Sequence, residues 1–254
     1  MPNWVRNIVH VAGDPEKIKE FLRFVRSDAD NEEETNLFDF RKIVPMPDTI
    51  RNTECGSRTN GDILCYLSNR FDKSFADLSE EKSRDRCFAR LLLSQDVYDR
   101  NKELFASLSD EQREESYERG KQYAKNYVEY GATTWYEWSI MNWGTKWNAC
   151  DSYLDGDGSD GHVCFEFDTA WSAPEPVLRK LTEMFPKLNF EGQFADEDFG
   201  NNCGVWGGGD GVFWMDYKDD VGCSVEEARR FACTVWGYEY EEVFDRDGSY
   251  REDV

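Results

Sequence analysis

The amino-acid sequence predicts an α+β protein in which a helical segment interrupts a sheet-forming domain. Segments with apolar residues at every second position alternate with segments whose apolar residues recur every three to four positions. Residues 48–135 differ from their surroundings, because charges of both signs are mixed there and helical patterns dominate. Hydrophobic residues make up 39% of the chain and aromatic residues 15%, which indicates a folded protein rather than a disordered acidic tail.

The N-terminal part is predicted to form a strand and then a helix. Residues 4–11 are rich in β-branched residues and end before Gly13. Asp14, Pro15 and Glu16 form a helix start, with a capping residue, a proline at the first helical position and an acid in the first turn. The apolar residues that follow have helical spacing, which predicts a buried face made of Ile18, Phe21, Leu22 and Val25.

Residues 37–44 are predicted to form a second strand. Phe38 and Phe40 alternate there with Asp39 and Arg41, and the segment Pro45-Met46-Pro47 ends the pattern. The helical segment that follows contains two predicted helices. One carries Cys87, Phe88, Leu91 and Leu92 on one face. The other begins with the capping box Ser109-x-x-Gln112 and ends at Gly131.

Strand and helix patterns return after residue 135. Residues 163–167 alternate as a strand, Ser172-x-x-Glu175 is predicted to cap a helix with Pro174 just inside it, and residues 188–194 form another strand. Gly207 to Gly211 is predicted to turn a hairpin. Ser224-x-x-Glu227 begins a last helix that Gly237 ends, and the acidic tail after Tyr240 is expected to fray.

The predicted order is therefore β-α-β, a helical insertion, β-α-β, then a hairpin and a helix. Two βαβ units in one sheet give a ferredoxin-like arrangement, with helices covering one face. The predicted domains are a ferredoxin-like α+β domain over residues 1–47 and 136–254, and a helical insertion over residues 48–135.

Cysteine usage and hydropathy point to a reducing compartment. The eight cysteines are never paired within four residues, and the chain shows no export signal and no apolar run of about 20 residues. We therefore expect reduced thiols, no membrane association and a location in the cytosol. A zinc site is disfavoured, because paired-cysteine spacing is missing and the chain has only two histidines. No metal, cofactor or catalytic residue is predicted.

The net charge of −22 is unevenly distributed. Residues 1–135 carry a net charge of −5 and residues 136–254 a net charge of −17. This charge disfavours direct binding to nucleic acid and favours a basic protein partner, with a solvated acidic surface as the alternative. The acids predicted to contact a partner are Asp196, Glu197, Asp198, Asp210, Asp216, Asp219 and Asp220.

Three further motifs leave alternatives open. The segment Asn142-Trp143-Gly144-Thr145-Lys146-Trp147 is either part of an aromatic core or a binding surface built on Trp143, Lys146 and Trp147. Residues 155–161 have the acid spacing of a calcium loop, with Glu166 at position twelve. Asp160 stands where that loop needs glycine and no helix follows, which favours a plain turn. Acid pairs with no histidine nearby are interpreted as solvated loops rather than as a hydrolytic metal site.

The chain resembles the YubB-like family of phage and plasmid proteins. The resemblance rests on Met1-Pro2-Asn3-Trp4, on Asn142 to Trp147 and on Phe165-x-Phe167-x-Thr169-Ala170-Trp171-x-x-Pro174. It covers the N-terminal strand and helix and roughly residues 140 to 215, but not the helical insertion. The resemblance implies a ferredoxin-like domain and a mobile-element accessory protein in the host bacterial cytosol, and it implies no enzyme activity. This chain has Asn148 where the family often has an acid, so no carboxylate role follows there.

The predicted function is binding without catalysis. We expect an acidic mobile-element protein that binds and inhibits a host nucleic-acid-directed defence protein, with carboxylates in the place of phosphates. One alternative is an assembly module that uses the Asn142–Trp147 region as a partner surface. The other is a metal-dependent hydrolase that uses the acidic loops.

Overall fold

The computed structural model describes residues 3–27, 36–81, 94–218 and 222–251. The chain divides into two compact units. The sheet unit consists of Met1–Pro45 and Ser139–Val254, and the helical unit consists of Met46–Trp138. The helix predicted around Cys87, Phe88, Leu91 and Leu92 lies outside the described residues.

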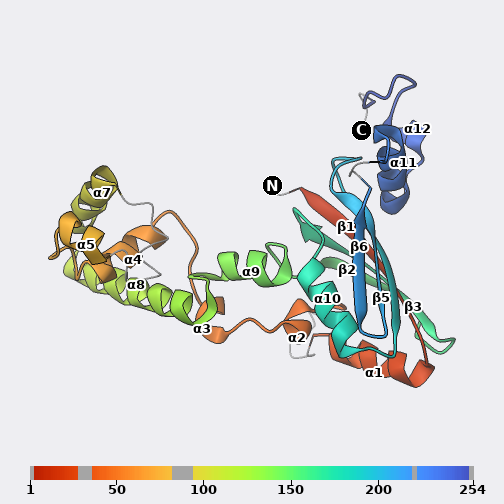
Figure 1. Ribbon diagram of the computed structural model, residues 1–254, viewed down its shortest axis with the longest axis horizontal. Coiled ribbons are helices and arrows are strands. Elements are labelled where there is room, and N and C mark those ends of the chain that lie inside the picture. The colour runs from red at the N-terminus through yellow and green to blue at the C-terminus, as the bar shows by residue number, and fades with distance from the viewer. Residues whose placement is uncertain (1–2, 28–35, 82–93, 219–221, 252–254) are drawn as a thin grey trace. The chain divides into compact units, whose positions relative to one another are not determined.

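The sheet unit is built on a six-stranded antiparallel sheet with the order β2-β3-β1-β4-β5-β6. Figure 1 labels most of its strands. The strands are β1 (Trp4–Ala12), β2 (Cys150–Asp155), β3 (His162–Ala170), β4 (Asn189–Asp196), β5 (Cys203–Gly209) and β6 (Val212–Tyr217). Its longer helices are α1 (Pro15–Val25), α10 (Glu175–Met184) and α11 (Val225–Trp236).

The first part of this sheet confirms the ferredoxin-like fold. The chain order β1, α1, β2, β3, α10, β4 is a β-α-β-β-α-β sequence, and β1 lies between β3 and β4. The predicted hairpin of β5 and β6 extends the sheet beyond β4, but Gly207, Gly208 and Gly209 belong to β5, and Asp210 and Gly211 form the turn. The helical unit enters the chain between α1 and β2, so it interrupts the first βαβ unit instead of separating two complete ones.

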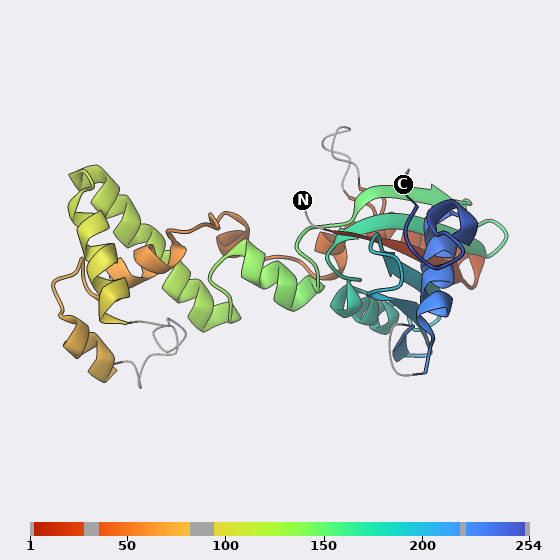
Figure 2. The same cartoon turned by 90° about the horizontal axis from the view of Figure 1, so that it is seen from above.

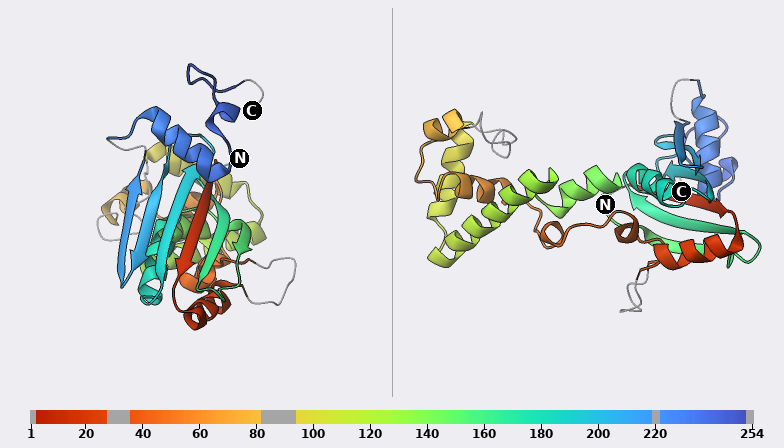
Figure 3. Two further views of the ribbon diagram at one scale, coloured as in Figure 1. Left: turned by 90° about the vertical axis from the view of Figure 1, so that its right-hand side faces the viewer. Right: turned by 60° about the horizontal axis from the view of Figure 1, so that its bottom comes forward.

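The two faces of the sheet carry different helices. Phe21 of α1 packs edge-on against Phe165 of β3 and Phe190 of β4, and it also contacts Phe185 at the end of α10. On the opposite face, Ile8 of β1 packs against a buried cluster that contains Ala228 and Ala232 of α11. Figure 3 (left) shows α11 crossing one end of the sheet. Buried residues alternate with less buried ones along β1, β3 and β4 because each strand buries one face under α1 and α10.

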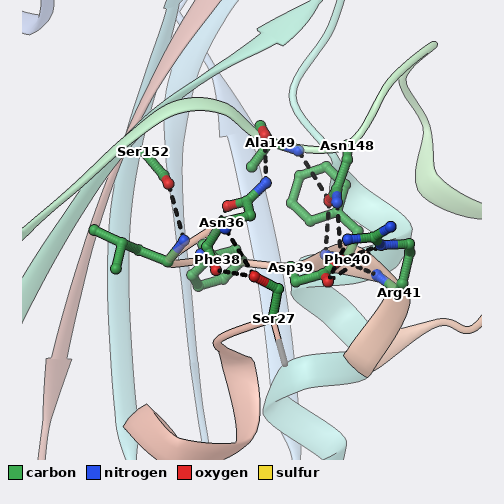
Figure 4. Close-up of polar contacts among 10 residues, drawn as sticks. Ser27, Asn36, Phe38, Asp39, Phe40, Arg41, Asn148, Ala149 and Ser152 are labelled. Atoms are coloured by element: carbon green, nitrogen blue, oxygen red, sulfur yellow. Dashed lines mark hydrogen bonds and ion pairs between the residues drawn. The ribbon is translucent and has the colours of Figure 1, made fainter. Parts of the chain in front are cut away.

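The strand predicted over residues 37–44 is wrong. The segment forms a short helix, α2 (Phe40–Ile43), and Asp39 is as buried as Phe38 and Phe40 on either side of it. Side-chain contacts hold the segment in place (Figure 4): the amide nitrogen of Asn36 donates to the Ala149 carbonyl at 2.5 Å, and the Leu37 N–H donates to Ser152 Oγ at 3.0 Å. The second strand of the fold is instead β2.

Asp39 and Asn148 explain why the short helix forms. The Asp39 carboxylate accepts the Arg41 N–H, which caps α2, and it also accepts a hydrogen bond from Asn148 Nδ2 at 2.8 Å. Asn148 Oδ1 in turn accepts the Phe40 N–H at 2.8 Å (Figure 4). An acid at position 148 would place a second negative charge beside Asp39, so the amide suits this chain.

Two other local predictions are corrected. Ser172 does not cap α10, because its hydroxyl donates to the Gly144 carbonyl, and Pro174 occupies the capping position without a side-chain bond. The tail after Tyr240 is ordered as far as the described residues extend. It forms α12 (Tyr240–Val243), and Phe244 is 2% exposed because it packs against Tyr240 and Tyr250.

The helical unit has a core of its own. Its elements are α3 (Asp48–Arg51), α4 (Thr59–Leu67), α5 (Phe75–Glu81), α7 (Gln95–Ala106) and α8 (Asp110–Tyr130), and Figure 2 shows them from above. The core centres on Ile63, Leu64, Phe71, Tyr98 and Tyr123. The predicted capping box of Ser109 and Gln112 is confirmed, and Gly131 ends α8 in the left-handed conformation.

Helix α9 (Trp135–Trp143) contains the boundary between the two units. In the described part of the chain, no helix has both the length and the apolar character that a membrane crossing requires.

Candidate binding site

One end of the sheet brings together segments that are far apart in the sequence. Because β1 is antiparallel to both β3 and β4, its first residues lie beside the last residues of those strands. Trp4 is paired with Ala170, and Val5 is paired with Asp196. The tryptophan motif of residues 142–147 joins this end, because Thr145 Oγ1 donates to the Ala170 carbonyl at 2.7 Å.

The first half of the tryptophan motif belongs to the core. Trp143 is 4% exposed, and its indole N–H donates to the Val44 carbonyl at 2.9 Å. Gly144 has a φ of +78°, and a Cβ there would lie 2.8 Å from the Pro176 ring. Of the three motif residues predicted to bind a partner, Trp143 therefore acts as a fixed support rather than as a contact surface.

The second half of the motif forms a tryptophan–lysine cluster, which we define as Trp4, Lys146, Trp147 and Trp171. The Lys146 ammonium lies 4.3 Å from the ring centre of Trp147 and 5.1 Å from that of Trp171. Trp4 packs on Trp147 with ring centres 5.8 Å apart. Cation–π contacts of this kind hold a lysine in place without neutralising it. Among the residues that the structure describes, no carboxylate forms an ion pair with Lys146.

Trp171 is the most unusual residue of the cluster. It is 39% exposed, and its φ of +73° lies in the left-handed region that large side chains rarely adopt. Two backbone contacts hold it there: its N–H donates to the Asn3 carbonyl, and its carbonyl accepts from Asn202 Nδ2, both at 2.9 Å. Strain of this kind is maintained where the surrounding structure fixes it, often at binding sites.

Asp196 supports the same end of the sheet from inside. It is 6% exposed, and its carboxylate accepts hydrogen bonds from Asn3 Nδ2, Asn202 Nδ2 and the Asp198 N–H at 3.2, 3.2 and 2.9 Å. Asn3 and Asn202 are the residues that hold Trp171. The Asp196 charge is therefore used within the fold and is not available to a partner.

The remaining predicted acids are distributed over both ends of the sheet. Glu197 and Asp198 are exposed beside the cluster, and Asp198 accepts from Asn201 Nδ2 and the Tyr250 hydroxyl. Burial, followed by the Asp198 charge, raises the pKa of Tyr250. Asp216 pairs with Lys218 at 3.4 Å and is 65% exposed. Asp210 lies in the β5–β6 turn at the opposite end of the sheet, and Asp219 and Asp220 lie outside the described residues.

The acidic residues of the calcium-like segment, residues 155–161 with Glu166, make contacts within the chain. Asp157 and Asp160 accept the N–H groups of Ser159 and His162, which makes two tight turns, and Glu166 forms an ion pair with Arg6 at 3.1 Å. Within the described ranges, no three histidine, cysteine or acidic side chains are grouped closely enough to hold a metal ion.

Sequence reasoning did not assign a role to Trp4, Trp171, Asn3 or Asn202. Trp4 and Trp171 both appeared in the motifs of the family resemblance, but nothing in their spacing indicates that they flank Lys146. The useful signal was their position at strand ends, since antiparallel pairing brings the start of one strand beside the end of the next.

Comparison with known families bears on the sheet unit. Residues 142–237 match a family model described as a ferredoxin-like domain in Api92-like protein. This match covers less than half of the chain and agrees with the observed fold. It gives no support to the narrower resemblance to YubB-like phage and plasmid proteins, which stays a prediction.

Comparison with solved structures finds a similar one, the crystal structure of protein api92 from Yersinia pseudotuberculosis. The two chains are 10% identical, with a TM-score of 0.39, and the similarity covers 83% of this chain and 95% of that one. A likeness at this level says nothing of function. Comparison with curated proteins finds no match.

Proposed function

We propose that this protein acts by binding a basic protein partner, with the sheet unit as the contacting part. The observation that carries the proposal is the charge of that unit. It holds 34 of the 52 acidic side chains and 16 of the 30 basic ones. Several of its exposed acids, among them Glu191, Glu197 and Asp210, form no ion pair with any described residue. A field of this sign speeds encounter with a positively charged surface.

The tryptophan–lysine cluster supplies an aromatic anchor for binding, which acidic side chains alone do not provide. Charged rims affect the association rate and its salt dependence, whereas tightly held aromatic residues supply most of the binding energy at protein interfaces. Trp171 is exposed, fixed by two backbone contacts and next to the exposed acids Glu197 and Asp198. This arrangement supports an aromatic anchor surrounded by negative charge.

The finer form of the proposal concerns the partner. A basic surface that normally binds nucleic acid is the natural complement of such an anchor, and the chain would compete with nucleic acid for it. The resemblance to phage and plasmid proteins suggests that this partner is a host defence protein. The chain would then act as an inhibitor in the host bacterial cytosol, without catalytic activity.

The test is a pull-down from bacterial lysate with the tagged chain, at low and at high salt, followed by binding kinetics with the purified partner. We expect a basic partner that dissociates as salt rises and that nucleic acid displaces. The double variant Glu197→Gln, Asp198→Asn should slow association. The matched double variant Glu103→Gln, Glu111→Gln in the helical unit should not. A partner held equally well at both salt concentrations would contradict the proposal.

A second pair of variants tests the anchor. Trp171→Ala should weaken binding about tenfold or more, because an interface anchor is worth about 2 kcal/mol or more and about 1.4 kcal/mol is a factor of ten in affinity. Trp214→Ala removes another exposed tryptophan, 51% accessible on β6, and should leave affinity unchanged. If Trp214→Ala weakened binding and Trp171→Ala did not, the contact surface would be the sheet hairpin instead.

The assembly-module alternative has one observation in its favour. Trp171 and Trp214 expose 39% and 51% of their surfaces, and aromatic residues are enriched at protein–protein interfaces. Sedimentation at several concentrations separates the two possibilities, because self-association without a basic partner supports assembly.

A further inference from the structure

The two histidines of the chain meet on the sheet. His10 and His162 are the only histidines among 254 residues and lie 152 positions apart. His10 Nδ1 and His162 Nε2 are nevertheless 3.3 Å apart, and their rings are stacked with centres separated by 5.4 Å. The pairing of β1 with β3 explains this, since His10 lies opposite Cys164 and Ala12 lies opposite His162.

The spacing between the two nitrogens suits a shared ligand. A zinc ion bonded to two imidazole nitrogens at about 2.0–2.1 Å in tetrahedral geometry holds those nitrogens roughly 3.3–3.4 Å apart. The same spacing also suits a direct hydrogen bond between neutral rings. A transition-metal ion and the proton of a hydrogen bond would therefore occupy the same place between the two nitrogens, whose spacing is set by the pairing of β1 with β3.

The surroundings leave this position accessible to a cation and attractive to it. His162 is exposed and His10 is half-buried. Glu191 of β4 lies directly opposite His10 and is exposed, so it adds negative charge at the next strand. Cys164 lies opposite His10 on β3, and burial raises the pKa of its thiol.

We propose that His10 and His162 form a binding site for one divalent transition-metal ion of the kind that imidazole favours, such as Zn²⁺. Water completes the coordination, because the described residues supply no third side chain close enough to form a set of three ligands. The site lies on β1 and β3, away from the tryptophan–lysine cluster, and does not depend on the proposed partner.

The experiment is a calorimetric titration of the reduced, full-length chain with Zn²⁺, in high salt and excess Mg²⁺ to occupy scattered carboxylates. We expect one saturable site. His10→Gln and His162→Gln should each lower its affinity tenfold or more, while the control Glu111→Gln, at an exposed acid of the helical unit, should leave it unchanged. Circular dichroism establishes that the histidine variants remain folded.

A pH series gives a second readout. Metal-binding imidazole must be neutral, so the Zn²⁺ affinity of the parent chain should fall on acidification. Affinity that does not change with pH would overturn the proposal. Equal affinity in the histidine variants and the parent, or no saturable binding at all, would also overturn it.

Discussion

The carboxylate of Asp196 shows how burial changes what an acidic residue does. In the sequence it is the first of three consecutive acids, and nothing distinguishes it from Glu197 and Asp198. In the fold it accepts three hydrogen bonds and holds Asn3 and Asn202, which in turn hold Trp171. The candidate site therefore depends on an acid that never reaches its surface.

Replacing Asp196 tests this role at the scale of one residue. Asp196→Ala leaves three donors without their acceptor in a buried place, which should lower the free energy of unfolding by about 1–3 kcal/mol. Urea unfolding followed by tryptophan fluorescence measures the loss. The neighbouring control Glu197→Ala removes an exposed acid and should change stability by no more than about 0.5 kcal/mol. Equal effects of the two substitutions would show that Asp196 is not structural.

Single elements differ in how far their own sequence determines them. The capping boxes at Ser109 and Ser224 and the glycines that end α8 and α11 were predicted, because each cap forms between residues a few positions apart. Residues 37–44 were predicted wrongly, because their short helix is held by Asn148 and Ser152, more than a hundred positions away. Phe38 and Phe40 alternate with polar residues, as in a half-buried strand, but Asp39 between them is just as buried as they are.

A tight helix contact gives a test at the scale of elements. Gly120 of α8 lies so close to α4 that an added Cβ would meet the Asp62 carbonyl oxygen at 1.8 Å. Gly120→Ala should therefore destabilise the helical unit by about 1–3 kcal/mol, although alanine favours helices by about 0.5–1 kcal/mol. The control is Gly56→Ala in the same unit, where no atom lies within 4 Å of the added Cβ. Chemical unfolding followed by circular dichroism compares them, and a stabilising effect of Gly120→Ala would contradict the close contact.

In the part of the chain that the structure describes, each unit buries hydrophobic residues of its own. The helical unit has a core around Ile63 and Tyr123, and the sheet unit has buried residues under α1 and α10 on one face and under α11 on the other. A domain with its own core can unfold as its own cooperative unit. The unequal charge of the two units adds to this difference, because self-repulsion acts mainly on the acidic sheet unit.

Thermal unfolding of the full chain should accordingly show two transitions. Differential scanning calorimetry of the variants assigns them: Gly120→Ala should lower one midpoint, by several degrees for a unit of this size, and Asp196→Ala should lower the other. Added salt should raise the midpoint of the transition assigned to the sheet unit more than that of the helical unit. One transition that both substitutions shift equally would show that the units unfold together.

The sequence by itself determined the ferredoxin-like fold class, the capped starts of α1, α8 and α11 and the acidic character of the chain, because these depend on periodicity, on local capping and on composition. Only the tertiary structure decided which residues meet. It placed the second strand at Cys150–Asp155, buried Asp196, set Lys146 between two indoles and brought His10 to His162. The burial of Asp196 and the meeting of His10 and His162 follow from the antiparallel pairing of β1 with β4 and with β3, whose paired residues lie more than a hundred positions apart, and no local pattern records such a register.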